Sequence, residues 1–190
     1  MRRGILFVIS GPSGTGKGTI CDRVINETDD VALSVSMTTR KPREGDVEGV
    51  NYFFVSEEEF KKTIEEDGLL EYACVYGNYY GTPKQAVLSK LAEGIDVILE
   101  IDTQGAMNIK KEYPEGVFIF IKPPSLEELR RRIESRGKDS PEVIEIRLGE
   151  AEKEMQLADE YNYCVINDDF DKAVEEVKSI MAAEHETATV

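Results

Sequence analysis

The chain is poor in the residues on which several classes of protein depend. Its only histidine, His185, lies close to the C-terminal end, so catalysis based on histidine is not expected. The three cysteines, Cys21, Cys74 and Cys164, are isolated from one another and odd in number, with no C-x-x-C pair among them. This spacing argues against a disulfide framework and against a zinc site.

Basic residues and long apolar runs are also scarce. The chain has 23 Lys and Arg against 38 Asp and Glu, a formal charge of -15. Such a surface repels nucleic acid and anionic membranes, so neither partner is expected, and any bound anion needs a local basic pocket. No stretch approaches a membrane span, and no cleavage-type leader follows the N-terminus. We therefore expect a soluble cytoplasmic protein of 190 residues that forms one compact unit.

A glycine-rich loop near the N-terminus carries the clearest motif. The apolar run Ile5–Ile9 precedes the loop and an amphipathic helix follows it. The loop consists of Gly11, Pro12, Ser13, Gly14, Thr15, Gly16, Lys17, Gly18 and Thr19. It fits the phosphate-loop pattern G-x-x-x-x-G-K. Small residues let backbone N–H groups converge on phosphate oxygens, and the helix N-terminus and Lys17 add positive charge. Such a turn can be a plain connection, but its strand–helix context favours phosphate binding.

The residue after the loop lysine departs from the usual pattern. That position commonly supplies a Ser or Thr hydroxyl to Mg²⁺, and here it is Gly18. The hydroxyl comes one residue later, on Thr19. Two alternatives follow: nucleotide oxygens and water hold Mg²⁺, as this hard ion often requires, or Thr19 compensates.

Apolar segments alternating with capped helices predict an α/β fold with a doubly wound parallel sheet. The expected strands are 5–9, 31–36, 96–102, 117–121 and 163–166. Ligands in such sheets lie beyond the carboxyl ends of the strands, where both the phosphate loop and the acids Glu100 and Asp102 fall. The stretch from about residue 36 to 80 has short strands and tight turns, which indicates an inserted subdomain.

Local signals place several helix ends. Ser56 with Glu59 forms a capping box, and Thr82 followed by Pro83 predicts another capped helix start. The tail from Glu184 onward is expected to fray.

Two basic clusters stand out in this acidic chain. Arg40 and Arg43 share a loop that Tyr52 and Tyr80 bracket. Arginine forks and phenolic hydroxyls suit a phosphate monoester, although a solvated basic loop would have the same composition.

The second cluster is Arg132, Arg136 and Arg147, on either side of a break in the helical pattern. Positive charge there could close over a transferring phosphoryl group. The alternative is ion pairing with glutamates on one exposed helix, and we favour that alternative for Arg130 and Arg131.

Two acids lie among apolar or aromatic residues. Glu71 could be a solvated strand residue and Asp102 a cap. A carboxylate also matches the two neighbouring donors of guanine, N1–H and the 2-amino group, while a hydroxyl from Ser36 or Thr82 could donate to O6. Adenine presents the opposite pattern at N1, so such a site would reject it.

Taken together, these residues resemble the guanylate kinase family along nearly the whole chain. The matching pieces are Gly11–Lys17, Ser36, Thr38–Arg40, Pro42–Arg43, Tyr52, Glu71, Gly77–Thr82, Ile101–Asp102, Gln104–Gly105, Arg136–Gly137, Arg147 and Asn167–Asp168. The resemblance implies a P-loop three-layer core of residues 1–35, 87–124 and 151–190. It further implies a GMP-binding α+β insert at 36–86 and a helical lid at 125–150.

The resemblance also implies an activity and a set of roles. The activity is ATP-dependent phosphorylation of GMP, and also of dGMP, to the diphosphate within purine metabolism. Transfer would be in line, without a covalent intermediate, with Mg²⁺ bridging ATP and domain closure excluding water. The guanine readers would be Ser36, Glu71, Thr82 and Asp102. The GMP phosphate would be held by Arg40, Arg43, Tyr52 and Tyr80. The moving phosphoryl group would be stabilised by Lys17, Arg136 and Arg147.

Two positions depart from the family pattern. Gly18 replaces the more usual serine, which leaves the Mg²⁺ shell open. Glu100 stands where aspartate is common, and its longer reach leaves two roles, toward a metal-bound water or as part of the GMP site. The sequence leaves the choice between monomer and homodimer open.

Three rival interpretations are weaker. Another nucleoside monophosphate kinase would share the loop but not the acids matched to guanine. A protein-binding module related to guanylate kinases would be expected to have a degraded phosphate loop, whereas Lys17 is present. A plain ATPase leaves Arg40, Arg43 and Tyr80 unexplained.

Overall fold

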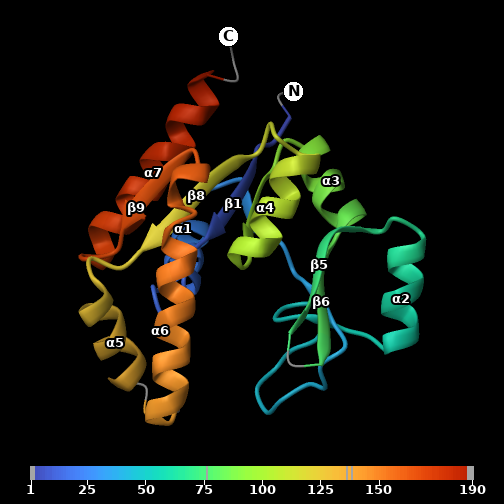
Figure 1. The fold of residues 1–190 in the computed structure, drawn as a ribbon. Helices are drawn as coiled ribbons and strands as arrows, with labels where there is room; N and C mark the ends of the chain where they lie inside the picture. The colour runs from blue at the N-terminus through green and yellow to red at the C-terminus, as the bar shows by residue number, and fades with distance from the viewer. Residues whose placement is uncertain (1–2, 76, 136, 138, 188–190) are drawn as a thin grey trace.

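A computed structural model describes residues 3–75, 77–135, 137 and 139–187, and a five-stranded sheet lies at its centre (Figure 1). In spatial order the strands are β2 (Val31–Leu33), β7 (Asp96–Glu100), β1 (Leu6–Ser10), β8 (Val117–Lys122) and β9 (Tyr163–Ile166). All neighbouring strands are parallel, which confirms the predicted sheet. Strand β1 lies between β7 and β8, so the loop that follows it emerges at the middle of the carboxyl edge.

Helices cover both faces of this sheet and complete a three-layer core. Successive side chains of β1 point to opposite faces, and each face has its own apolar cluster. Helices α1 (Lys17–Glu27) and α7 (Phe170–Thr187) pack on the face that carries Phe7. Helices α3 (Lys84–Ala92) and α4 (Thr103–Glu112) pack on the face that carries Val8. Burial on both faces explains why these strands are almost continuously apolar.

A second, smaller sheet lies between β2 and α3 in the sequence. Its spatial order is β4 (Phe53–Phe54), β3 (Met37–Thr38), β6 (Asn78–Pro83) and β5 (Leu69–Val75). Helix α2 (Glu57–Glu65) packs on this sheet through the buried Phe60, whose ring stacks 5.3 Å from that of Tyr79. The capping box of Ser56 and Glu59 is present at its start, as predicted.

Two further helices form a hairpin next to the phosphate loop. Helices α5 (Leu126–Ser135) and α6 (Pro141–Met155) share a small apolar core, and a short 3₁₀ turn, η1 (Ala158–Glu160), follows them. Figure 1 shows this hairpin and the second sheet on opposite sides of the carboxyl edge of the main sheet. The mouth of the phosphate loop therefore lies between them.

Two local predictions were wrong. Helix α3 begins at Lys84 with no side-chain cap, and Thr82 instead lies in β6 and donates its hydroxyl to Glu71. The tail does not fray at Glu184, because α7 continues to Thr187 and Glu184 accepts a hydrogen bond from the Tyr163 hydroxyl. Helix α4 occupies a stretch for which no element was predicted.

Among the helices that the structure describes, none is both long enough and apolar enough to cross a membrane.

Candidate active site

The phosphate loop adopts a conformation that depends on its glycines. Gly11, Gly14 and Gly16 all have positive φ, at 139°, 94° and 91°. A Cβ on Gly11 would lie 2.1 Å from the carbonyl oxygen of Ile121, so no side chain fits where β1 leaves the sheet. Gly16 precedes the first residue of α1, and the first turn of that helix contains no acid, so its N–H groups face the loop without a competing charge.

The loop encloses a cavity of about 480 Å³, here called the loop cavity. It is lined by Gly11, Ser13, Gly14, Gly16, Lys17, Gly18, Thr19, Glu100, Ile101, Asp102 and Glu154. Pro12 and Thr15 do not line this cavity. They stabilise the loop through a hydrogen bond, in which the Thr15 hydroxyl donates to the Pro12 carbonyl at 2.9 Å. Of the nine predicted loop residues, seven therefore face the cavity.

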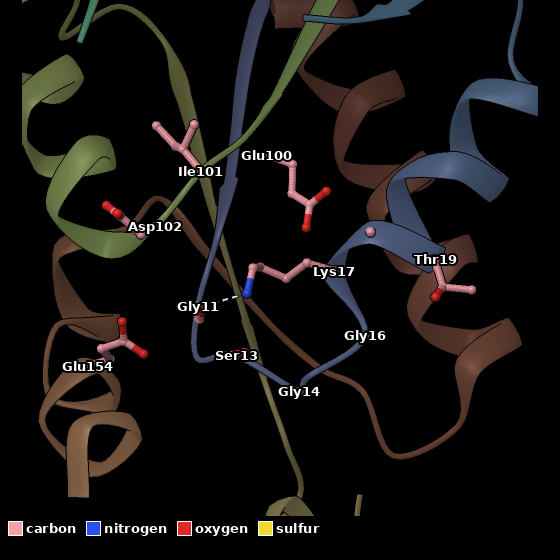
Figure 2. A pocket seen from close by; sticks show the side chains of 11 residues that line it. Gly11, Ser13, Gly14, Gly16, Lys17, Thr19, Glu100, Ile101, Asp102 and Glu154 are labelled. Carbon is pink, nitrogen blue, oxygen red and sulfur yellow. Dashed lines mark hydrogen bonds between the residues drawn. The ribbon is translucent and has the colours of Figure 1, made fainter. Parts of the chain in front are cut away.

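Lys17 holds its ammonium group within the loop itself. Its Nζ donates to the carbonyl oxygen of Gly11 at 2.6 Å (Figure 2) and to that of Pro12 at 2.9 Å. Burial lowers the pKa of Lys17, and the nearby carboxylates of Glu100 and Glu154 partly offset this effect. The ammonium is thus poorly solvated, a state that an incoming phosphate would relieve.

Three carboxylates surround Lys17 in the loop cavity. Figure 2 shows Glu100, at the end of β7, and Asp102 and Glu154 on the side nearer to α4 and α6. Burial raises the pKa of Glu100 and the pKa of Glu154, and Lys17 opposes both shifts. Asp102 caps α4, where its carboxylate accepts from the Gly105 N–H at 2.7 Å. Asp102 is therefore a cap, one of the two roles considered from the sequence, and the same side chain also lines the cavity.

A second cavity of about 320 Å³, here called the insert cavity, opens between the small sheet and the end of β7. It is lined by Ser36, Tyr52, Glu71, Ala73, Tyr80, Gly81, Glu100, Ile101 and Asp102. Six of the predicted GMP-binding residues are in this list. The remaining three, Arg40, Arg43 and Thr82, are not.

Glu71 is the most perturbed acid in this cavity. Its Oε1 accepts from the Thr82 hydroxyl at 2.7 Å, so Thr82 positions Glu71 from behind. Burial raises the pKa of Glu71 to about 7, with a further contribution from Asp102, while the Thr82 hydrogen bond acts in the opposite direction. A Cβ on Gly105 would lie 3.0 Å from Glu71 Oε2, so the glycine lets this carboxylate approach Asp102.

The two predicted phosphate arginines occupy different surroundings. Arg40 lies over the rings of Tyr52 at 5.2 Å and Phe54 at 5.5 Å, and its Nη2 is 2.9 Å from Asp46 Oδ2. The Tyr52 and Tyr80 rings contact each other at 5.9 Å, which places Arg40 behind the tyrosine wall of the cavity. Arg43 is exposed, and its backbone N–H donates to Asp46.

One arginine of the predicted lid reaches the phosphate loop. Arg147 on α6 donates to the Ser13 hydroxyl at 2.6 Å and pairs with Asp139. Arg136 lies outside the described residues.

The arginines of α5 mostly pair within the hairpin. Arg130 pairs with Glu145, and Arg131 pairs with Glu128. Both arginines therefore form ion pairs with glutamates, the alternative that we favoured for them. Arg132 also pairs with Glu128 and donates to the Asn167 carbonyl at 2.9 Å.

Sequence reasoning missed Glu154 and underrated Asn167. Glu154 lines the loop cavity from α6, and its carboxylate accepts a hydrogen bond of 3.3 Å from Thr103 on α4. Asn167 donates from Nδ2 to the Thr15 carbonyl at 2.7 Å and so ties the loop to the end of β9. Glu154 gave no signal because alternating glutamates on a helix resemble a solvated face; Asn167 was noted only within a matched motif.

The loop cavity and the insert cavity share Glu100, Ile101 and Asp102. Two adjoining cavities, one built on a phosphate loop and the other on acids, hydroxyls and tyrosines, define a P-loop nucleotide-binding protein with room for a second ligand.

Comparison with known proteins identifies the family. The guanylate kinase family model matches residues 3–184. A guanylate kinase of Caldanaerobacter subterraneus subsp. tengcongensis is 59% identical over 183 residues, covering 96% of this chain and 89% of its relative. One from Clostridium acetobutylicum is 55% identical over 183 residues, covering 96% and 87%. The crystal structure of guanylate kinase from Anaplasma phagocytophilum aligns with a TM-score of 0.77 at 33% identity, covering 96% of this chain and 87% of that one. The chain therefore belongs to the guanylate kinase family.

Proposed function

We propose that the chain transfers the terminal phosphoryl group of ATP to GMP, and to dGMP, yielding ADP and the guanosine diphosphate. The observation that carries this proposal is the wall that the two cavities share at Glu100, Ile101 and Asp102. A donor phosphate in the loop cavity and an acceptor phosphate in the insert cavity would meet at this wall. Placing two reactants in contact is the main contribution that a protein makes to phosphoryl transfer.

On the donor side, the loop would bind the ATP phosphates through backbone N–H groups and Lys17. Lys17 would exchange its bonds to the Gly11 and Pro12 carbonyls for phosphate oxygens. Arg147, which already reaches Ser13, would add a second positive charge from the lid. Arg136 would join it from a position outside the described residues. These charges would stabilise the phosphoryl group during transfer.

On the acceptor side, Glu71 and Asp102 would accept from the guanine N1–H and 2-amino groups, with Ser36 near O6, while Thr82 would hold Glu71 in place through its hydroxyl. Arg40, Arg43, Tyr52 and Tyr80 would bind the phosphate of GMP. Because that phosphate is itself the nucleophile, no covalent intermediate and no strong general base are needed. Its binding would draw the Arg40 guanidinium away from Asp46.

The residues of the loop cavity fit a Mg²⁺ ion that arrives with ATP. Among the described residues there is no group of three or more acidic, histidine or cysteine side chains that could hold a metal by itself. Mg²⁺ suits such a place, because it keeps several waters and takes only one or two protein ligands besides nucleotide phosphates. Several side-chain oxygens line the cavity, and we propose that those of Thr19 and Glu100 are the candidates for contact with the ion. When bound, the ion would neutralise charge on the ATP phosphates.

We further propose the three-part division into a core (1–35, 87–124 and 151–190), a GMP-binding insert (36–86) and a lid (125–150). The second sheet falls within the insert, and α5 and most of α6 fall within the lid, which supports this division; the last turn of α6, up to Met155, extends into the core segment. Closure of insert and lid over the cavities would exclude water and limit ATP hydrolysis. One chain lines both cavities, so we infer that a single copy is competent, in a cytoplasm that supplies both nucleotides.

The direct test is a coupled assay of ADP formation from ATP and Mg²⁺, with GMP, dGMP, AMP, CMP and UMP offered separately. We expect fast turnover with GMP and dGMP only. Turnover with AMP would still indicate a nucleoside monophosphate kinase, but it would overturn the roles proposed for Glu71 and Asp102. Binding of GMP without any turnover would favour a protein-binding module instead.

The raised pKa of Glu71 predicts a pH dependence of GMP binding. Guanine donors need the ionised carboxylate, and a pKa of about 7 means that this form appears only as the pH rises through neutrality. We therefore expect the Kd of GMP to fall by about tenfold between pH 6 and pH 8, levelling off above. Calorimetry in buffers of different ionisation enthalpy should also detect release of a proton on binding at pH 6.

The phosphate of GMP titrates in the same range, with a second pKa of about 6 for a monoester. Glu71→Gln supplies the matched control, because it keeps the phosphate titration and removes that of the carboxylate. The slope attributable to Glu71 is the difference between the two profiles. Identical profiles would show that Glu71 does not need to ionise for GMP to bind.

A further inference from the structure

The two positions at which this chain departs from the family pattern are neighbours in space. A Cβ placed on Gly18 would lie 3.4 Å from Glu100 Oε2 and 3.5 Å from Oε1. Gly18 is in the first turn of α1, and Glu100 is the last residue of β7. The glycine thus presents bare backbone to the Glu100 carboxylate.

The carboxylate occupies the region that a hydroxyl at position 18 would enter. A serine hydroxyl lies one bond beyond Cβ, and the Glu100 oxygens are in van der Waals contact with that Cβ position. Both side chains would therefore bring an oxygen to the same part of the loop cavity. An aspartate at position 100 would be shorter by one methylene and would leave this region open.

The charges around Glu100 determine whether its carboxylate is repelled or attracted when ligands are bound. It lines the loop cavity and the insert cavity, which in the proposed function receive two phosphate groups. A carboxylate between phosphates is repelled unless a cation lies between them. Lys17 is one such cation, and in the described part of the chain its ammonium is already bonded to the Gly11 and Pro12 carbonyls.

Resting on the proposed function, which places a nucleotide in the loop, we propose that Gly18 and Glu100 act as a pair. Gly18 gives up the hydroxyl that many phosphate loops direct to Mg²⁺, and the Glu100 carboxylate supplies an oxygen to the ion, directly or through a bound water, from the neighbouring strand. Glu100 then belongs to the metal side of the site, and the GMP site keeps Glu71 and Asp102. The exposed Thr19 hydroxyl is not required for this role.

The pairing is testable by exchanging the two side chains together and one at a time. The variants are E100D, G18S and the double variant G18S/E100D, with E176D as a matched control on the exposed face of α7. The readout is the affinity of Mn²⁺ for the complex of the protein with ADP, measured from the electron paramagnetic resonance signal of free Mn²⁺. Calorimetry of ADP without metal, together with thermal unfolding, shows that each variant folds and binds nucleotide.

We expect E100D to weaken Mn²⁺ binding by about tenfold, the size typical of losing a supporting group at a metal. G18S alone should weaken it by about threefold, because the new hydroxyl donates to the Glu100 carboxylate and competes with the ion. The double variant should return to within about threefold of the original affinity, a non-additive result that contacting residues can show. E176D should leave the affinity unchanged.

A second substitution guards against a purely steric explanation. E100Q keeps the length of Glu100 and removes its charge, so Mn²⁺ binding should weaken while binding of ADP without metal is unchanged or tighter. Additive effects of G18S and E100D on Mn²⁺ would overturn the pairing. Full Mn²⁺ affinity in E100D and E100Q, with weakened GMP binding, would return Glu100 to the GMP site.

The outcomes also separate this inference from the proposed function. If the unaltered protein phosphorylates GMP but the Mn²⁺ effects are additive, only the pairing fails. If the unaltered protein does not bind ADP, both fail together.

Discussion

Replacing Lys17 with alanine should lower kcat for GMP phosphorylation by roughly 10³-fold, because phosphoryl transfer depends on charges aimed at the moving group. The Lys17 ammonium is the positive side-chain charge that lines the loop cavity among its described residues. It is poorly solvated and surrounded by Glu100, Asp102 and Glu154, so its positive charge is directed at whatever enters the cavity. Without it, three carboxylates would face the ATP phosphates.

The fold should survive this change. Lys17 begins α1, and the apolar face of that helix is formed by other residues, among them Ile20 and Val24. Gly11, whose carbonyl loses a partner, lines the loop cavity, and the Pro12 carbonyl still accepts from the Thr15 hydroxyl. The measurement is steady-state turnover together with thermal unfolding, with Lys172→Ala as a control at an exposed lysine of α7. Near-normal turnover in Lys17→Ala would remove Lys17 from the catalytic group.

The core sheet could be predicted because each of its strands and helices has a recognisable sequence pattern of its own. Strands covered on both faces must be apolar throughout, as in the run from Val117 to Ile121, and helices between them carry caps. The phosphate loop could be predicted for a similar reason, because its backbone requires glycine at fixed positions. Positive φ at Gly14 and Gly16 and the close approach of Ile121 to Gly11 require residues without a Cβ.

The site was harder to predict where its residues come from distant parts of the chain. Thr82 was predicted to cap a helix because proline follows it, yet it lies in strand β6, which places its hydroxyl against Glu71 on β5. The contact between Gly18 and Glu100 joins residues in different elements, and no local pattern relates them. Glu154 owes its place to the packing of α6 beside α4, which a helical pattern does not specify.

The pKa of Glu71 is another property that the sequence does not contain. An acid between Leu70 and Tyr72 alternates like any strand residue with one exposed face. Its pKa is raised mainly because the fold buries the carboxyl group, and further because Asp102 lies nearby. A partly buried acid held beside a second acid costs folding free energy, which a ligand with two adjacent donors can recover on binding.

Glu71→Gln should therefore raise the KM for GMP on the order of 10²-fold and change the KM for ATP by less than about threefold. The amide presents one oxygen and one N–H₂ group to the guanine edge, so one guanine donor meets another donor. Glutamine is nearly isosteric with glutamate and keeps an oxygen for the Thr82 hydroxyl, so the cavity should keep its shape. The exposed Glu65→Gln on α2 provides the matched control.

The ratio of GMP turnover to AMP turnover distinguishes a role of Glu71 in guanine recognition from a purely structural role. An amide N–H can donate to adenine N1, so selectivity for GMP over AMP should fall in Glu71→Gln even where total activity is low. A structural role would instead weaken GMP and ATP equally, lower the thermal midpoint and leave the GMP-to-AMP ratio unchanged. The insert cavity makes the first result the expected one, since Glu71 lines that cavity and is not among the residues lining the loop cavity.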